Sequence, residues 1–197
     1  MRQLTSNDPR PALHEARDRC VPRGRPGRTG GFTLVELLVT IAVAGILAVI
    51  GVPALRTFLQ NDRQWTNANS LVMSLNAARS EAIKQDAPVS VCPTTNGTSC
   101  STTAAWAQGW IVLSSVANSV PVLTIPALPT GTSLTEANAL TAVTFQSTGT
   151  VSAPAAFTLC DSRGGTYARY VQVTLTGSIA SSPTVGKNTN GAALTCP

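Results

Sequence analysis

Histidine is almost absent from this chain, and the single copy, His14, lies within the first 31 residues. A Ser-His-Asp or Cys-His catalytic arrangement therefore cannot form in the rest of the sequence. The cysteines lack the CxxC spacing of zinc sites. Only 5% of the residues are aromatic and 12% are charged, so we expect a core of small aliphatic side chains. These shortages argue against an enzyme, a metal site and a cofactor, and they favour a structural or binding protein.

Ionisable residues are missing from a long apolar stretch, Leu37 to Leu55. Its 19 positions, at ~1.5 Å of helical rise each, cover roughly the ~30 Å hydrocarbon core of a bilayer. The stretch predicts a transmembrane helix over 32–55. Glu36 stands at its edge, where a carboxylate costs about 2.5 kcal/mol or more unless it finds a partner. Glu36 is therefore a functional candidate, with solvation by lipid headgroups as the alternative.

The net charge of +5 is concentrated at the N-terminus. Seven arginines against three acidic residues give residues 1–31 a charge of +4, and the remainder carries +1. Basic flanks stay cytoplasmic, so we expect the residues after the span to lie outside the cytoplasm. The net positive charge of the whole chain is consequently weak evidence for nucleic-acid binding, because most of it belongs to the N-terminal targeting segment.

After the span, apolar residues recur every three or four positions, which predicts an amphipathic helix over 56–87. It continues the membrane helix through a kink at Pro53, and Pro88 bounds it. The residues expected on its apolar face are Trp65, Ala68, Leu71, Val72, Leu75, Ala78 and Ala82.

Residues 88–197 are rich in β-branched residues and short alternations separated by turn residues. A helix followed by about six antiparallel strands predicts an α+β fold in which the amphipathic helix lies against the sheet. The expected strands are 89–92, 109–115, 120–125, 141–146, 156–160 and 168–176.

Gly31 before Phe32, followed by Thr33, Leu34 and Glu36 ahead of an apolar run, closely resembles the signal of type IV pilins and type II secretion pseudopilins. The segments LNAARSEAIKQ (75–85), GWIVL (109–113) and CDSRG (160–164) are similar to the FimT, FimU and GspH branch of minor pilins and pseudopilins. The resemblance implies a pilin-like fold, with a long N-terminal helix packed on an antiparallel sheet or sandwich.

The resemblance also implies processing. A prepilin peptidase would remove the basic leader, residues 1–31, by cutting between Gly31 and Phe32, and the new amine of Phe32 would be N-methylated. Glu36 would then meet the amino terminus of a neighbouring subunit in a filament core. The leader is unusually long, so the start is either Met1 or Val21, and the shorter form would lack Cys20.

Four cysteines remain beyond the membrane, an even set that suits disulfides in an oxidising compartment. Four cysteines allow three pairings, of which nearest neighbours is the simplest: Cys92 with Cys100, and Cys160 with Cys196. In the chain-entropy model the smaller loop contributes roughly 2.5 kcal/mol and the larger roughly 4 kcal/mol.

We expect a structural subunit that assembles with other pilins or pseudopilins, anchored in inner-membrane lipid beforehand. The two disulfides and the CDSRG segment favour a pilus over a secretion pseudopilus. The rival is a DNA-binding tip pilin of the FimT type, with Arg163, Arg169 and Lys187 as candidate contacts. The stretch after TLT, residues 177–180, lacks the arginines of the G-R-x-R type motif, which disfavours DNA binding. Arg163 has an alternative structural role as a partner of Asp161.

Overall fold

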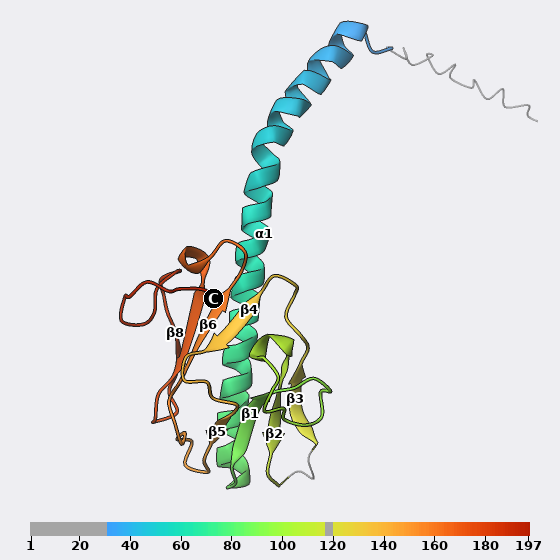
Figure 1. Ribbon diagram of the computed structural model, residues 1–197. Helices are drawn as coiled ribbons and strands as arrows, with labels where there is room; N and C mark the ends of the chain where they lie inside the picture. The colour runs from blue at the N-terminus through green and yellow to red at the C-terminus, as the bar shows by residue number, and fades with distance from the viewer. Residues whose placement is uncertain (1–30, 117–119) are drawn as a thin grey trace, which may run out of the picture. The chain divides into compact units, whose positions relative to one another are not determined.

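A computed structural model describes residues 31–116 and 120–197 (Figure 1). Residues 1–30 of the predicted leader, which include Cys20 and the two candidate starts Met1 and Val21, lie outside the described residues. The chain divides into two units, one ending at Ile46 and the other running from Leu47 to Pro197. Helix α1, Leu34–Gln85, contributes to both units and continues through Pro53. By length and composition α1 is able to cross a membrane, and its side chains are exposed from residue 34 to residue 59.

The second half of α1 buries one face. The buried positions repeat every three or four residues and therefore lie on one side of the helix. Trp65 was expected on this face but is 57% exposed. At about 100° per residue, Trp65 lies about 100° around the helix from Gln64 and about 60° from Ala68, which places it beyond the edge of the buried face. The buried residues are Gln64, Ala68, Leu71, Ser74, Leu75, Ala78 and Ala82.

The helix ends through its backbone geometry rather than at Pro88 itself. Asp86 adopts a positive φ of 50°, and the amide of Ala87 donates to the carbonyl of Ala82 at 3.2 Å. This left-handed residue satisfies a carbonyl of the last turn and redirects the chain into the first strand.

Two four-stranded antiparallel sheets follow α1. The first has the order β3-β2-β1-β5, and the second has the order β4-β6-β7-β8. An α+β fold with one long helix against antiparallel sheets is thereby confirmed, and the described residues form eight strands where six were expected. The first sheet contains β1 (Val89–Pro93), β2 (Trp110–Ser114), β3 (Pro121–Ile125) and β5 (Val143–Phe145); the second contains β4 (Ser133–Glu136), β6 (Ala155–Cys160), β7 (Arg169–Val173) and β8 (Ile179–Ser181).

One hydrophobic cluster joins α1 to both sheets. Trp110 of β2 is fully buried, and its indole nitrogen donates to the Oγ of Ser74 on α1 at 2.9 Å. Trp106 lies edge-on to Phe157 of β6, with ring centroids 4.8 Å apart. Gly109 separates the two tryptophans with a φ of 106°, and a Cβ there would approach the carbonyl oxygen of Ile125 to 2.7 Å. Glycine therefore lets β2 begin directly beside β3.

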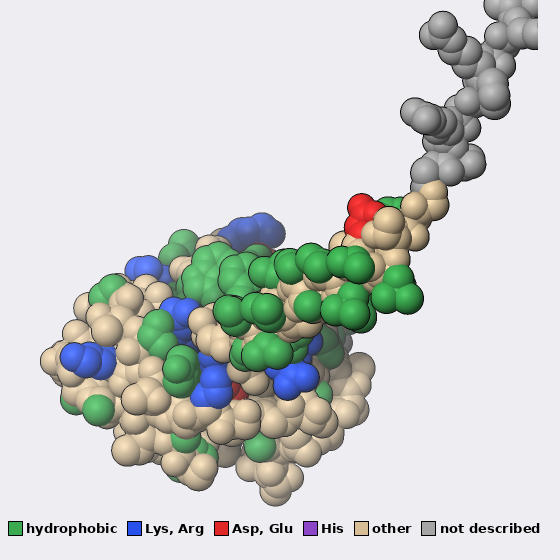
Figure 2. Space-filling view, turned by 90° about the horizontal axis from the view of Figure 1, so that it is seen from above, with side chains coloured by type: hydrophobic (Ala, Val, Ile, Leu, Met, Phe, Trp, Pro, Cys, Tyr) green, Lys and Arg blue, Asp and Glu red, His purple; other side chains and the backbone are tan. Residues whose placement is uncertain are grey.

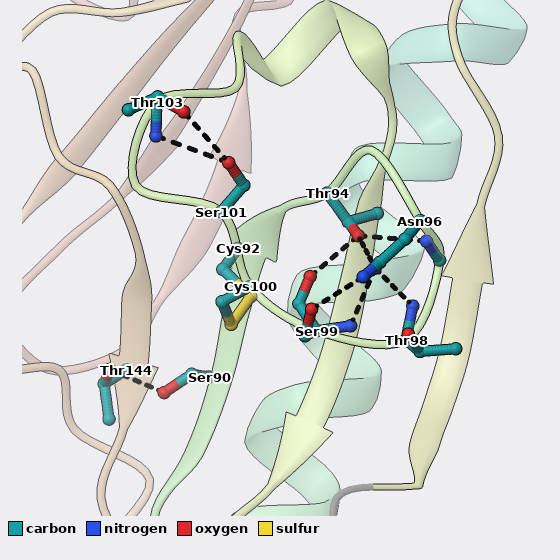
Figure 3. Close-up of a disulfide and its surroundings, with 11 residues drawn as sticks. Ser90, Cys92, Thr94, Asn96, Thr98, Ser99, Cys100, Ser101, Thr103 and Thr144 are labelled. Carbon is teal, nitrogen blue, oxygen red and sulfur yellow. Dashed lines mark hydrogen bonds between the residues drawn. A yellow bond between two sulfur atoms is a disulfide. The ribbon is translucent and has the colours of Figure 1, made fainter.

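Two disulfides close loops of the β region, as the fold class implied. Cys92 is joined to Cys100, eight residues away, and Cys160 is joined to Cys196, 36 residues away. Within the first loop, the Oδ1 of Asn96 accepts the amides of Thr98 and Ser99, each at 3.0 Å (Figure 3). The loop is therefore held by side-chain hydrogen bonds as well as by the covalent bond.

Candidate functional site

The start of α1 is capped by Thr33. The Thr33 hydroxyl accepts the backbone amide of Glu36 at 3.2 Å, and the Thr33 carbonyl accepts the amide of Leu37 at 3.1 Å. Thr33 and Glu36 have the spacing of a capping box, in which a Ser or Thr cap is followed three residues later by Glu or Gln. The helix consequently begins at Leu34, directly after the Thr33 cap, and the T-x-x-E signal that marks this start was not used in the sequence prediction.

Glu36 lies in the first turn of α1, where the helix dipole favours an acidic residue by about 0.3–1 kcal/mol. Gly31 and Phe32 precede the helix and are exposed, Phe32 by 79%. Figure 2 shows hydrophobic side chains (green) along the helical segment that follows and one acidic group (red) near its start. The segment thus presents an extended apolar surface with one carboxylate, Glu36, near its beginning.

Arg163 sits in the turn after β6 and connects it to α1. Its Nε donates to Oδ2 of Asp161 at 3.0 Å, and its Nη2 reaches the same oxygen at 2.6 Å. The remaining nitrogen, Nη1, donates to Oδ1 of Asn61 on α1 at 2.7 Å. The guanidinium also lies over Tyr167, 4.3 Å from the ring centroid. With all three nitrogens engaged, Arg163 serves as a connection between the turn and the helix.

Burial alone would raise the pKa of Asp161. The side-chain and backbone hydrogen bonds from Arg163, together with its charge, outweigh that effect and hold the pKa of Asp161 below its ordinary value of 3.8. The Asp161 carboxylate therefore contributes stability above that value and loses its contribution as the pH falls through the depressed pKa.

We expect Asp161→Asn to lower the free energy of unfolding by about 2 kcal/mol at neutral pH, because it leaves the mostly buried Arg163 charge unpaired. Urea titrations of both proteins from neutral pH to about pH 3 measure the difference. The difference in free energy of unfolding should shrink on acidification, because the unsubstituted chain loses the same ion pair when Asp161 is protonated. A difference that stays constant with pH would contradict the role of the ion pair. Glu81→Gln is the control, because its partner Lys84 is 75% exposed and a pair with one solvated member is worth about 0.5 kcal/mol or less.

The other candidate cations come from separate segments. Arg169 begins β7 and is partly buried, whereas Lys187 is exposed near the C-terminal tail. Within residues 31–116 and 120–197, no cluster of His, Cys, Asp and Glu is arranged to hold a metal ion. Gln64 was not anticipated: it is 2% exposed, and its side-chain amide acts together with Arg163 to lower the pKa of Asp161. It lines a polar cavity of about 100 Å³ together with Asp161.

The model of the family described as type II transport protein GspH matches residues 67–177, more than half of the chain. The chain belongs to the GspH family. The prokaryotic N-terminal methylation motif matches residues 27–52, which include Gly31, Phe32 and Glu36. The resemblance of the chain to the GspH branch of pilin-like proteins is therefore confirmed. No protein in the curated set matches this GspH-family chain.

Two crystal structures of one protein share the fold of this GspH-family chain, and a third solved structure is similar at a lower score. The type IV minor pilin FimU of Pseudomonas aeruginosa is 22% identical with a TM-score of 0.51, over 62% of this chain and 90% of FimU. A second crystal form of FimU gives a TM-score of 0.50 at 22% identity, covering 60% and 92%. The minor pseudopilin EpsH of Vibrio cholerae, at 15% identity, gives a TM-score of 0.45, covering 60% and 95%.

Proposed function

We propose that this chain is a minor pilin or pseudopilin, a structural subunit of a type IV pilus or of a type II secretion pseudopilus. The proposal rests on one observation: the same chain contains an N-terminal methylation motif, a helix that is apolar and long enough to cross a membrane, and a β region that matches the GspH family. Residues 1–31 are the leader, residues 32–55 anchor the chain in the inner membrane, residues 56–87 continue the helix, and residues 88–197 form the periplasmic domain.

The chemistry of assembly depends on two opposite charges. Prepilin peptidase cuts after Gly31, and the methylated secondary amine of Phe32 keeps its positive charge. Thr33 starts the helix directly after Phe32, so the amine is presented at the end of an apolar rod. Glu36 of one subunit then pairs with the amine of the next, which satisfies two charges that neither lipid nor a filament core solvates. The helix thereby serves first as a membrane anchor and later as filament core.

A DNA-binding role of the FimT type is not favoured over this assignment. Arg163 is already bound to Asp161 and Asn61, and the segment after the predicted TLT strand end carries no cation at residues 177–180. A surface without adjacent cations gains little from counterion release.

We expect intact-mass analysis of the chain from membranes to give residues 32–197 plus one methyl group, because processing precedes assembly in this proposal. We expect the same species in mechanically sheared surface filaments for a pilus, or in a membrane-attached assembly for a pseudopilus.

Deleting the gene should abolish either twitching motility or protein export, and the affected activity identifies the filament. An uncleaved chain, or a deletion that alters neither activity, would contradict the proposal.

A further inference from the structure

A cavity of about 210 Å³ lies where α1 meets the second sheet, away from the N-terminal motif. Three of the lining residues belong to α1. The others belong to the beginning of β7, the end of β8 and the two residues after it. The cavity is lined by Trp65, Ala68, Asn69, Arg169, Tyr170, Ser181, Ser182 and Pro183.

Arg169 is the anomalous residue in this lining. The strand register pairs Arg169 with Leu159, and Leu159 with Leu134, which places the three on one face of the sheet. Leu159 and Leu134 are buried against the core, with 2% and 4% exposure. Arg169 thus extends a core-facing row, and its Nε is buried without a hydrogen-bond partner among the described residues. The described ion pairs involve Arg163 and Lys84 instead.

A buried guanidinium nitrogen without an acceptor is costly and leaves the Arg169 charge poorly compensated, and an anion placed in the cavity that Arg169 lines would offset that charge. Guanidinium matches a carboxylate with two parallel hydrogen bonds. Trp65 supplies an exposed aromatic wall of the kind that is enriched where proteins bind one another. The cavity therefore suits a carboxylate attached to an apolar stem, which is the chemistry of an Asp or Glu side chain.

Two other sources of an anion fit less well. Trp65 is ten residues beyond Leu55, the end of the apolar run, so at ~1.5 Å per residue the cavity begins about 15 Å outside the hydrocarbon. Headgroup layers extend only about 5–8 Å beyond it. Nucleic acid is disfavoured because Arg169 is the one cation among the lining residues, and phosphate backbones are held by several cations together.

We infer that this cavity binds an Asp or Glu side chain of a neighbouring pilin-like subunit in the assembled filament. The inference rests on the proposed function and adds a second contact between subunits, outside the apolar core. Arg169 positions the neighbour through its charge, and Trp65 covers the stem of the acidic side chain.

The test places a benzophenone amino acid at position 65 of the full-length chain in the producing cells, keeping an aromatic wall. After irradiation, mass spectrometry identifies the attached peptide. We expect a peptide from a second protein that carries its own N-terminal methylation motif, with Asp or Glu near the attachment point. Attachment only to lipid, nucleic acid or proteins without the motif, or no attachment at all, would overturn the inference.

A charge exchange makes the test specific. Arg169→Glu should lower the cross-link yield at least tenfold, because it opposes two carboxylates, and changing the identified acidic residue of the partner to Arg should restore it. Failure to restore the yield would overturn the inference. Lys187→Glu, an exposed charge change outside the cavity, should leave the yield unchanged. If the unsubstituted chain is absent from filaments, the proposed function is wrong. If it is present in filaments and Arg169→Glu gives the same cross-link yield, only the assignment of the cavity is wrong.

Discussion

Replacing Glu36 with Gln is expected to leave the chain cleaved, methylated and inserted in the inner membrane but to remove it from the filament. Glutamine keeps the size of the side chain and suits the third helical position of a capping box as well as glutamate does. The backbone bond from Glu36 to Thr33 is also retained, because it does not involve the side chain of residue 36. The substitution therefore removes the charge alone.

The physical basis is the pairing of two charges in an apolar medium. A filament core built from segments such as 32–55 contains little else that could solvate the methylated amine of Phe32. Leaving one member of a buried ion pair without its partner costs about 3–5 kcal/mol, which is a factor of about 10² to a few times 10³ in the assembly equilibrium. Incorporation should consequently fall below detection.

The measurement compares the amount of mature chain in the isolated filament fraction with the amount in the membrane. Thr33→Ala is the matched control: it deletes the helix cap, worth about 1 kcal/mol, and keeps the acid, so incorporation should persist. Undiminished incorporation of Glu36→Gln would show that Glu36 is merely solvated by headgroups. Equal loss from Thr33→Ala and Glu36→Gln would assign the effect to helix initiation.

The sequence predicted the features that follow from long repeated patterns. An uncharged run of 19 residues indicates a membrane helix, and the recurrence of Leu71, Leu75, Ala78 and Ala82 places the buried face of its continuation. Both signals are sums over many residues, so a single exception does not erase them. Cysteine parity likewise indicated two disulfides, because it depends on counting rather than on geometry.

The features that were missed depend on contacts between distant segments. Strands β4 and β8 contain only four and three residues, and their sequences, SLTE and IAS, alternate too briefly to be distinguished from turns. They exist because β6 and β7 offer them open sheet edges. Trp65 was assigned to the core by its hydrophobicity, whereas polar Gln64 and Ser74 occupy that face. Ser74 is tolerated there because Trp110 donates to its hydroxyl.

That contact between Ser74 and Trp110 also connects the second half of α1, which continues the predicted membrane segment, to the β region. Trp110 lies in β2, the second strand of its sheet, and is 0% exposed. The Ser74 hydroxyl, also 0% exposed, donates to the Ser70 carbonyl at 2.8 Å while it accepts from the indole. One aromatic side chain therefore provides both apolar contact and a satisfied polar group at the joint between helix and sheet.

Trp110→Ala should lower the free energy of unfolding of the β region by about 4 kcal/mol, because it opens a large cavity between α1 and the sheet. Urea titration of the detergent-solubilised chain, followed by circular dichroism of the β region, measures the change. Trp110→Phe keeps most of the apolar volume and should cost only about 1–2 kcal/mol. Ser74→Ala leaves the indole donor buried without an acceptor and should cost about 1–3 kcal/mol.

The double variant Trp110→Phe with Ser74→Ala separates packing from hydrogen bonding. Once the indole donor is gone, Ser74→Ala no longer leaves a buried group unsatisfied, so the double variant should be less destabilised than the two single changes added together, by about 1 kcal/mol. Strict additivity would mean that the two residues act independently and that apolar volume alone holds the sheet to α1. In either case, a Trp110→Ala variant whose free energy of unfolding lies within about 1 kcal/mol of that of the unsubstituted chain would contradict the proposed role of Trp110. The β region would then be held to α1 by other contacts.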